Sequence, residues 1–256
     1  ELELIQIIDR IFGELKIRVT IRVNNRKILA GIADMAGEKE RITDITVAVD
    51  KLDKIGKEGV RQELLQRGIS PESVAKLEPV INLSGPTSSK LVELKKVLAT
   101  SEEGLKGIAE MEELFGYLAL EPVASAVELD LSLARGLNYY TGAIIEVRAE
   151  DAAIGSVCGG GRYDDLTGIF GLPGVSGVGV SFGADRIYDV MLMLNIFPEQ
   201  TGVATEALVV NFGREELPEL LKIIRSLREA GIPSEIYPDP VKLKKQFAYA
   251  DARKIP

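Results

Sequence analysis

Residues 127–182 contain successive strand-like segments with no helical pattern between them, and this feature constrains the fold more than any other. The segments are "VELDLSLA", "GLNYYTGAIIEVRAE", the "SVCGGGR" region and "VSGVGVSF". Strands that follow one another without intervening helices indicate an antiparallel sheet. We therefore expect an antiparallel β-sheet over this part of the chain, and an α+β protein as a whole.

The flanking regions have a different character. Residues 2–15 have helical spacing of apolar residues, "RVTIRVNN" alternates like a half-buried strand, and residues 26–37 again favour a helix. From about residue 38 to residue 118 we find only helical periodicity with charged faces. After residue 206 the pattern runs strand, helix, strand, helix, which predicts a small parallel sheet in a separate α/β domain.

Composition limits the chemistry that this chain can perform. It has 256 residues, no histidine, one cysteine and a formal net charge of −8. A histidine base, a Ser-His-Asp triad, a His-ligated metal and an internal disulfide are therefore excluded. The single cysteine, the lack of a basic apolar leader and the lack of an apolar run of about 18 residues favour a cytoplasmic protein with no membrane span.

The segment "LARGLNYYTGAIIEV" places Arg135 at the start of what we interpret as a buried strand. A buried arginine needs an anionic partner, which the chain either contains or binds. Gly136 and Gly142 allow close backbone approach. An edge strand with a solvent-reaching arginine and two interface tyrosines, Tyr139 and Tyr140, explains this segment slightly better when it is taken alone.

The segment "GGGRYDDL" carries three consecutive glycines, so a flat ligand or a phosphate can lie against its backbone. It lacks the Walker pattern, and the antiparallel context argues against a dinucleotide fingerprint. The alternative is a tight turn in which Asp164 and Asp165 are solvated caps.

The segment "GVSGVGVSFGADRI" repeats small residues along a strand and then begins a helix with Asp185 and Arg186. An arginine at a helix N-terminus beside a glycine-lined strand can hold a phosphate and stack on a base. Close packing of a helix on a sheet is the alternative. Taken together, the three glycine-rich segments describe a nucleotide site built on a sheet.

In this order and spacing, "LARGLNYYTG", "GGGRYD" and "GVGVSFGADRI" strongly resemble the histidyl-tRNA synthetase family: its two histidine motifs and motif 3 of class II synthetases. The resemblance covers nearly the whole chain. It implies a partial catalytic core at 1–37 and 121–198, a helical insertion domain at 38–120, a linker at 199–206 and a truncated anticodon-binding α/β domain at 207–256. Motifs 1 and 2 of the class would precede this sequence, so we expect the chain by itself to be inactive.

The resemblance implies that L-histidine reacts with ATP, accompanied by Mg²⁺, and that the adenylate then acylates tRNA(His). By the same resemblance Arg135 is the catalytic cation and also contacts ATP, together with Gly183 and Arg186, and the chain itself holds no metal. The residues implied for histidine binding are Tyr139, Tyr140, Tyr163, Leu137, Gly159, Gly160 and Gly161. A homodimer is implied for the full-length protein. The family usually has Asp where this chain has Asn138.

Three other interpretations remain open at this point. One is the regulatory subunit of ATP phosphoribosyltransferase, which resembles a synthetase but does not aminoacylate; Arg135 and the α/β tail argue against it. Another is a synthetase-like sensor domain that binds histidine or uncharged tRNA. The third is an α+β domain whose glycine strands only pack. For tRNA contact, Lys242, Lys244 and Lys245 could meet phosphates or form a solvated helix face.

Overall fold

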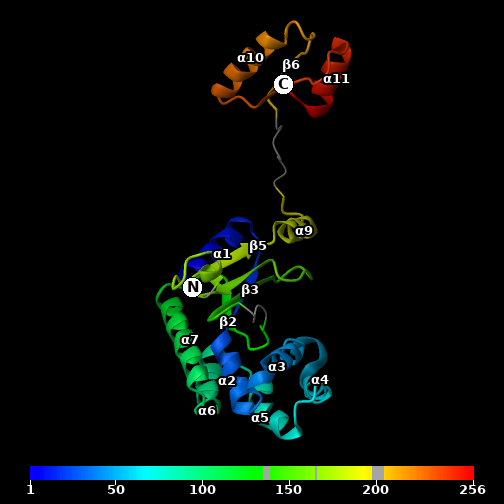
Figure 1. Cartoon of the computed structure of the whole chain (residues 1–256). Helices are drawn as coiled ribbons and strands as arrows, with labels where there is room; N and C mark the ends of the chain where they lie inside the picture. Colours follow the sequence, from blue (N-terminus) through cyan, green and yellow to red (C-terminus); the bar gives the residue numbers. More distant parts are fainter. Residues whose placement is uncertain (135–138, 165, 198–204) are drawn as a thin grey trace. The chain divides into compact units, whose positions relative to one another are not determined.

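The structure of this chain is a computed structural model that describes residues 1–134, 139–164, 166–197 and 205–256 (Figure 1). Its contacts divide the chain into two units, residues 1–195 and residues 196–256. The first unit contains the large sheet and its helices. The second contains a two-stranded sheet with two helices.

The sheet of the first unit has the order β2-β1-β3-β4-β5. Its strands are β1 Val19–Asn25, β2 Ala126–Leu129, β3 Ala143–Ala149, β4 Cys158–Arg162 and β5 Val178–Phe182. The pairs β1–β3, β3–β4 and β4–β5 are antiparallel, which confirms the predicted sheet. Strand β2 departs from the prediction, because it runs parallel to β1. The long helical segment between β1 and β2 is what allows a parallel pair here.

Two details of the predicted strands are wrong. Of the strand expected to start at Arg135, the described residues Tyr139 to Gly142 lie outside regular strand structure, and β3 starts at Ala143. Thr141 instead donates its backbone N–H to the carbonyl of Arg162 at 2.8 Å. The glycines of "GGGRYDDL" lie inside β4, so they form neither a strand end nor a tight turn.

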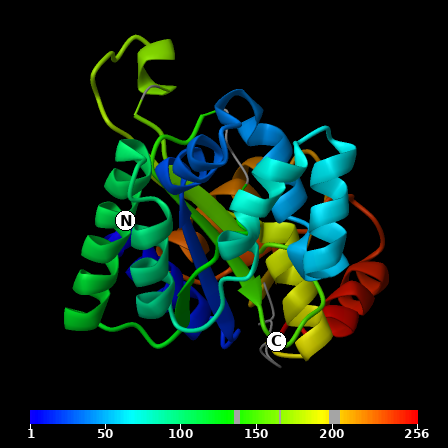
Figure 2. The same cartoon turned by 90° about the horizontal axis from the view of Figure 1, so that it is seen from below.

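The helical elements of the first unit have the following bounds. They are α1 Leu2–Glu14, α2 Arg26–Ala36, the 3-10 turn Lys39–Arg41, α3 Ile42–Val49, α4 Leu52–Gln66, α5 Pro71–Ile81, α6 Thr87–Val97, α7 Glu102–Leu120, α8 Leu166–Ile169 and α9 Ala184–Leu194. Two helices begin with side-chain caps of the usual residue types, since Asn25 accepts from the backbone N–H of Lys27 and Ser70 from that of Ser73. Helices α6 and α7 lie side by side (Figure 2).

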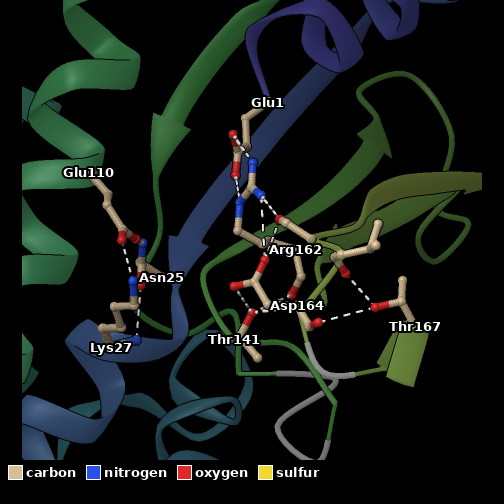
Figure 3. Close-up of polar contacts among 10 residues, drawn as sticks. Glu1, Asn25, Lys27, Glu110, Thr141, Arg162, Asp164 and Thr167 are labelled. Atoms are coloured by element: carbon tan, nitrogen blue, oxygen red, sulfur yellow. Dashed lines mark hydrogen bonds and ion pairs between the residues drawn. The ribbon is translucent and has the colours of Figure 1, made fainter. Parts of the chain in front are cut away.

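The core of the first unit joins α1 to the sheet and α2 to α7. Phe12 of α1 is fully buried, and its ring centroid lies 6.0 Å from that of Phe182 of β5. Burial of such a side chain contributes roughly 1.5–3 kcal/mol. Helices α2 and α7 approach closely at Gly31, where a Cβ atom would lie 2.5 Å from the Cα of Gly104. A polar link continues from there, because Asn25 donates to Glu110 of α7 at 2.7 Å (Figure 3).

The second unit follows the predicted strand, helix, strand, helix order. Its elements are β6 Ala207–Val209, α10 Leu217–Glu229, β7 Ser234–Ile236 and α11 Leu243–Arg253. Strands β6 and β7 are parallel. The fully buried Gln246 accepts from the backbone N–H of Asn211 and donates to its carbonyl, both at 2.8 Å, and so joins α11 to the end of β6. Within the described ranges, no helix has the length and apolar character needed to cross a membrane.

Candidate functional site

A pocket of about 480 Å³ opens over β3, β4 and the start of α9. It gathers side chains and backbone from the three glycine-rich segments of the sequence. The predicted site residues that line it are Tyr139, Tyr140, Gly159, Gly160, Gly183 and Arg186. Antiparallel pairing of β3, β4 and β5 brings these segments together although they are spread over almost fifty residues.

Tyr139 and Tyr140 form an aromatic pair on one wall of the pocket. Their ring centroids are 4.3 Å apart and the rings are tilted by 57°. Tyr140 covers Gly161, where a Cβ atom would lie 2.8 Å from the Tyr140 ring. Burial first, and then a hydrogen bond with Tyr139, raise the pKa of the Tyr140 hydroxyl well above its usual value. Tyr140 therefore stays a neutral hydroxyl that can donate and accept at physiological pH.

Tyr163 and Gly161 are not among the residues that line the pocket. The ring of Tyr163 lies on the glycines of the β5 segment. A Cβ atom at Gly177 would lie 2.4 Å from Cε2 of Tyr163, and one at Gly179 would lie 2.8 Å from its hydroxyl. Gly177 and Gly179 therefore leave the space that the Tyr163 ring occupies.

The two glycines on the pocket floor have different reasons for lacking a side chain. At Gly160 a Cβ atom would lie 2.0 Å from the carbonyl oxygen of Gly179, so the pairing of β4 with β5 requires glycine. At Gly159 the nearest contact would be the carbonyl of Ile145 at 3.5 Å, an ordinary van der Waals distance. Packing does not demand glycine there, and the missing side chain leaves space in the pocket for a ligand.

The far wall of the pocket is the N-terminus of α9. Gly183 is the N-cap of this helix and gives it no side-chain cap. The first turn of a helix offers free backbone N–H groups and a positive dipole end, which favour an anion. Arg186 extends this positive wall, and its Nη1 donates to the carbonyl of Ser156 at 2.7 Å. Asp185 lines the same wall and partly offsets its charge.

Glu146 lies in the pocket and is a residue that sequence reasoning missed. It is only 3% exposed, and Arg148 donates to its carboxylate at 2.8 Å. A buried carboxylate is stable only when it is paired in this way. The sequence signal was available, since Glu146 is the acidic residue in the middle of the otherwise apolar stretch "AIIEV".

Cys158, Ser156 and Ser181 also line the pocket and were not predicted. Burial raises the pKa of the Cys158 thiol to about 11. The thiol is therefore protonated at neutral pH and is a poor nucleophile, since the reactive form is the thiolate. Its contribution is that of a small apolar side chain in β4. Among the described residues, no group of three or more acidic, Cys or His side chains is placed to hold a metal ion.

Arg135 and Leu137, two of the predicted site residues, lie outside the described residues. The structure does show what flanks them, because Leu133 and Tyr139 both line the pocket. The fully buried Asn24 of β1 donates to the carbonyl of Leu133 at 2.8 Å. The chain at Leu133 is thus fastened to β1, and the roles of Arg135 and Leu137 stay predictions.

Comparison with known proteins gives one consistent result. A family profile described as histidyl-tRNA synthetase matches residues 1–187. The histidine–tRNA ligase of Phocaeicola vulgatus is 57% identical over the whole chain, and that of Porphyromonas gingivalis is 54% identical. The crystal structure of histidyl-tRNA synthetase from Nostoc sp. PCC 7120 covers 99% of this chain at 33% identity, with a TM-score of 0.75. The chain spans 56% of the length of the two ligases and 61% of the Nostoc protein.

Proposed function

The chain belongs to the histidyl-tRNA synthetase family, and from this premise we propose that it is the histidine-activating part of a histidine–tRNA ligase. The proposed reaction joins L-histidine to ATP, releases pyrophosphate, and transfers the histidyl group to tRNA(His) in the cytoplasm. The pocket over β4 supports this proposal, because it offers the two kinds of surface that the first step needs.

One observation carries the proposal: the pocket has neutral tyrosines on one wall and the positive N-terminus of α9 on the other. Gly159 and Gly160 of β4 lie between the two walls. An imidazole ring fits beside Tyr140, whose hydroxyl can donate or accept a hydrogen bond. The backbone of Gly159 leaves room for the amino acid and the sugar. Arg186 and the first turn of α9 suit the phosphates and the base of ATP.

The proposed chemistry is attack by an oxygen of the histidine carboxylate on the α-phosphorus of ATP. The bond from the α-phosphorus to the bridging oxygen breaks, and pyrophosphate leaves with the electron pair. Charge spreads over the phosphate oxygens in the transition state, so fixed cations accelerate the step. We assign Arg186 to the ATP side of the pocket. We assign Arg135 to the α-phosphate and the histidine carboxylate, on the strength of its motif.

Mg²⁺ enters in this proposal as part of the substrate MgATP. Phosphate oxygens and water supply most ligands of Mg²⁺ in such sites, and one or two carboxylates suffice from the protein. Glu146 and Asp185 are the carboxylates that line the pocket in the described part of the chain. For tRNA, Lys242, Lys244 and Lys245 of the second unit are the proposed phosphate contacts. A homodimer of the longer protein also belongs to the proposal.

The test is histidine-dependent exchange of labelled pyrophosphate into ATP, measured in a polypeptide of the relatives' length that contains this chain. We expect exchange in the unsubstituted protein and a loss of about 10²–10³ in kcat/KM for Arg135→Ala and for Arg186→Ala. Arg10→Ala is the matched control, because Arg10 is a solvent-exposed arginine on α1 whose partner is Glu14. Histidine binding without exchange would favour the regulatory or sensor interpretation instead.

A further inference from the structure

A pair of hydrogen bonds clasps the two tyrosine-bearing segments together beside the pocket. Thr141 directly follows Tyr140, and Asp164 directly follows Tyr163. The Thr141 hydroxyl donates to Oδ2 of Asp164 at 2.7 Å, and the backbone N–H of Asp164 donates back to the same hydroxyl at 3.1 Å. Figure 3 shows these two side chains facing each other. The Thr141 hydroxyl thus both donates to and accepts from Asp164, and these two bonds fix the distance between the two segments.

Asp164 is held on its other side as well. Ser176 donates its hydroxyl to Oδ1 of Asp164, and Arg162 lies 3.6 Å from the same oxygen. Arg162 also donates to Ser176 at 2.5 Å and to Glu1 at 2.6 Å and 2.9 Å. The hydrogen bond from Ser176 first, and then those involving Thr141 and Arg162, lower the pKa of Asp164. The carboxylate is therefore ionised at neutral pH, the state that accepts all of these bonds.

The backbone on both sides of the clasp is already fixed. Thr141 donates its N–H to the carbonyl of Arg162 at 2.8 Å, and Tyr163 donates its N–H to that of Gly177 at 2.7 Å. These two bonds extend the ladder beyond the ends of β3 and β4. The Thr141–Asp164 pair adds a side-chain link between the two residues that directly follow Tyr140 and Tyr163.

We propose that Thr141 and Asp164 are positioning residues, which fix Tyr140, a residue of the pocket wall, relative to the segment of Tyr163 and thereby set the fit of the pocket to a flat, polar imidazole ring. The inference rests on the proposed function, since it concerns the amino-acid side of the same site. Neither residue acts on the reacting atoms. Their contribution is to the binding of histidine and leaves the binding of ATP unchanged.

The test compares four variants in a polypeptide of the relatives' length that contains this chain. Thr141→Val keeps the shape of the side chain and removes the hydroxyl, whereas Thr141→Ser keeps the hydroxyl. Asp164→Asn changes the charge and one acceptor. Thr20→Val is the matched control, because Thr20 donates to the carboxylate of Glu150 at 3.0 Å on a part of the sheet outside the pocket lining.

We expect Thr141→Val and Asp164→Asn to raise the KM for histidine about tenfold, the effect of one lost hydrogen bond to a charged group, while the KM for ATP changes less than about twofold. Thr141→Ser and Thr20→Val keep both constants near those of the unsubstituted protein. An unchanged histidine KM in Thr141→Val, or an equal rise in the ATP constant, overturns the positioning role.

The outcomes separate the two proposals. If the unsubstituted protein shows no histidine-dependent exchange, the proposed function fails and the positioning role fails with it. If that protein exchanges normally and the clasp variants do too, only the positioning role fails. Should Thr141→Val lose its fold, as judged by circular dichroism, the comparison of Asp164→Asn with Thr141→Ser gives the same decision.

Discussion

Two pockets in the first unit have nearly the same volume and very different chemistry. The pocket over β4 measures about 480 Å³, and a second pocket between α1, α7 and the ends of β1 and β4 measures about 490 Å³. Glu1, Glu110 and Glu113 line the second pocket, and its one arginine in the described lining, Arg162, is already bound to Glu1. Glu110 is paired with Lys27, so Glu113 is the carboxylate of this lining that repels an anionic substrate.

The pocket over β4 has a wall that favours an anion. Glu146 is neutralised by Arg148, and Arg186 and the open N-terminus of α9 form a far wall whose positive charge Asp185 only partly offsets. The comparison teaches that volume does not identify a site in this molecule. The positive helix end with Arg186 and the absence of a side chain at Gly159 favour the pocket over β4 as the proposed site.

The largest expected effect comes from closing the floor of the β4 pocket. In Gly160→Ala the new Cβ atom meets the carbonyl of Gly179 and pushes β5 away from β4. We expect a loss of about 2–3 kcal/mol in the free energy of unfolding, the cost of overpacking a tight contact, together with loss of pyrophosphate exchange. Urea denaturation and the exchange assay measure the two effects, and a stable, active Gly160→Ala protein would contradict the structural reason given for this glycine.

A smaller and more selective effect is expected at Gly177. A Cβ atom there meets the ring of Tyr163, which can move, rather than the backbone of a neighbouring strand. Gly177→Ala should raise the KM for histidine about tenfold, while the melting temperature falls by less than in Gly160→Ala. A thermal melt beside the kinetic assay checks this, and an unaltered histidine KM would show that Tyr163 has no part in the pocket.

The pH dependence of stability should show the contribution of Asp164. Its pKa is lowered in the folded protein, so its stabilising contribution is complete above the unfolded pKa near 4 and is lost as pH falls through the folded value. The contribution is below about 1 kcal/mol, because the side chain is 40% exposed and screened. The free energy of unfolding, measured from pH 6 to pH 2, should fall less steeply in Asp164→Asn. Identical slopes would contradict the contacts with Ser176, Thr141 and Arg162 that lower the pKa of Asp164.

The smallest effect is expected in the second pocket. Glu113 is exposed on α7 and accepts from the hydroxyl of Tyr117 at 2.9 Å. Glu113→Gln should change the free energy of unfolding by less than about 0.5 kcal/mol and leave the KM for histidine and for ATP as they are. A marked rise in either constant would move the substrate site to this second pocket and overturn the comparison of the two.

Much of the fold could be predicted from the sequence because its signals are local. The alternation in β1, the caps at Asn25 and Ser70, and the absence of any described helix longer than the four-residue α8 between β3 and β5 each depend on a few neighbouring residues. The parallel pairing of β2 with β1 could not be predicted, because it joins residues about a hundred positions apart. A pattern of neighbouring residues in the sequence does not predict a contact over such a distance along the chain.

The candidate site also has features that could be predicted from the sequence and features that could not. The glycine segments and Arg186 could be found by residue type, and the structure brings them into one pocket. The reason for each glycine could not be predicted from the sequence, because it depends on tertiary contacts. A side chain at Gly160 would collide with the neighbouring strand β5, and one at Gly177 would collide with the ring of Tyr163. The Thr141–Asp164 clasp was missed for the same reason: its two residues are ordinary in type and meet only when β3 and β4 pair.

The most direct test of the central claim is a crystal structure of a polypeptide of the relatives' length that contains this chain, bound to a non-hydrolysable histidyl-adenylate analogue. The account predicts the imidazole beside Tyr139 and Tyr140, the sugar over Gly159, the adenylate phosphate facing Arg135, and the adenine toward Arg186 and the first turn of α9. An analogue bound in the pocket of Glu110 and Glu113, or bound over β4 with its imidazole away from the tyrosines, would contradict it.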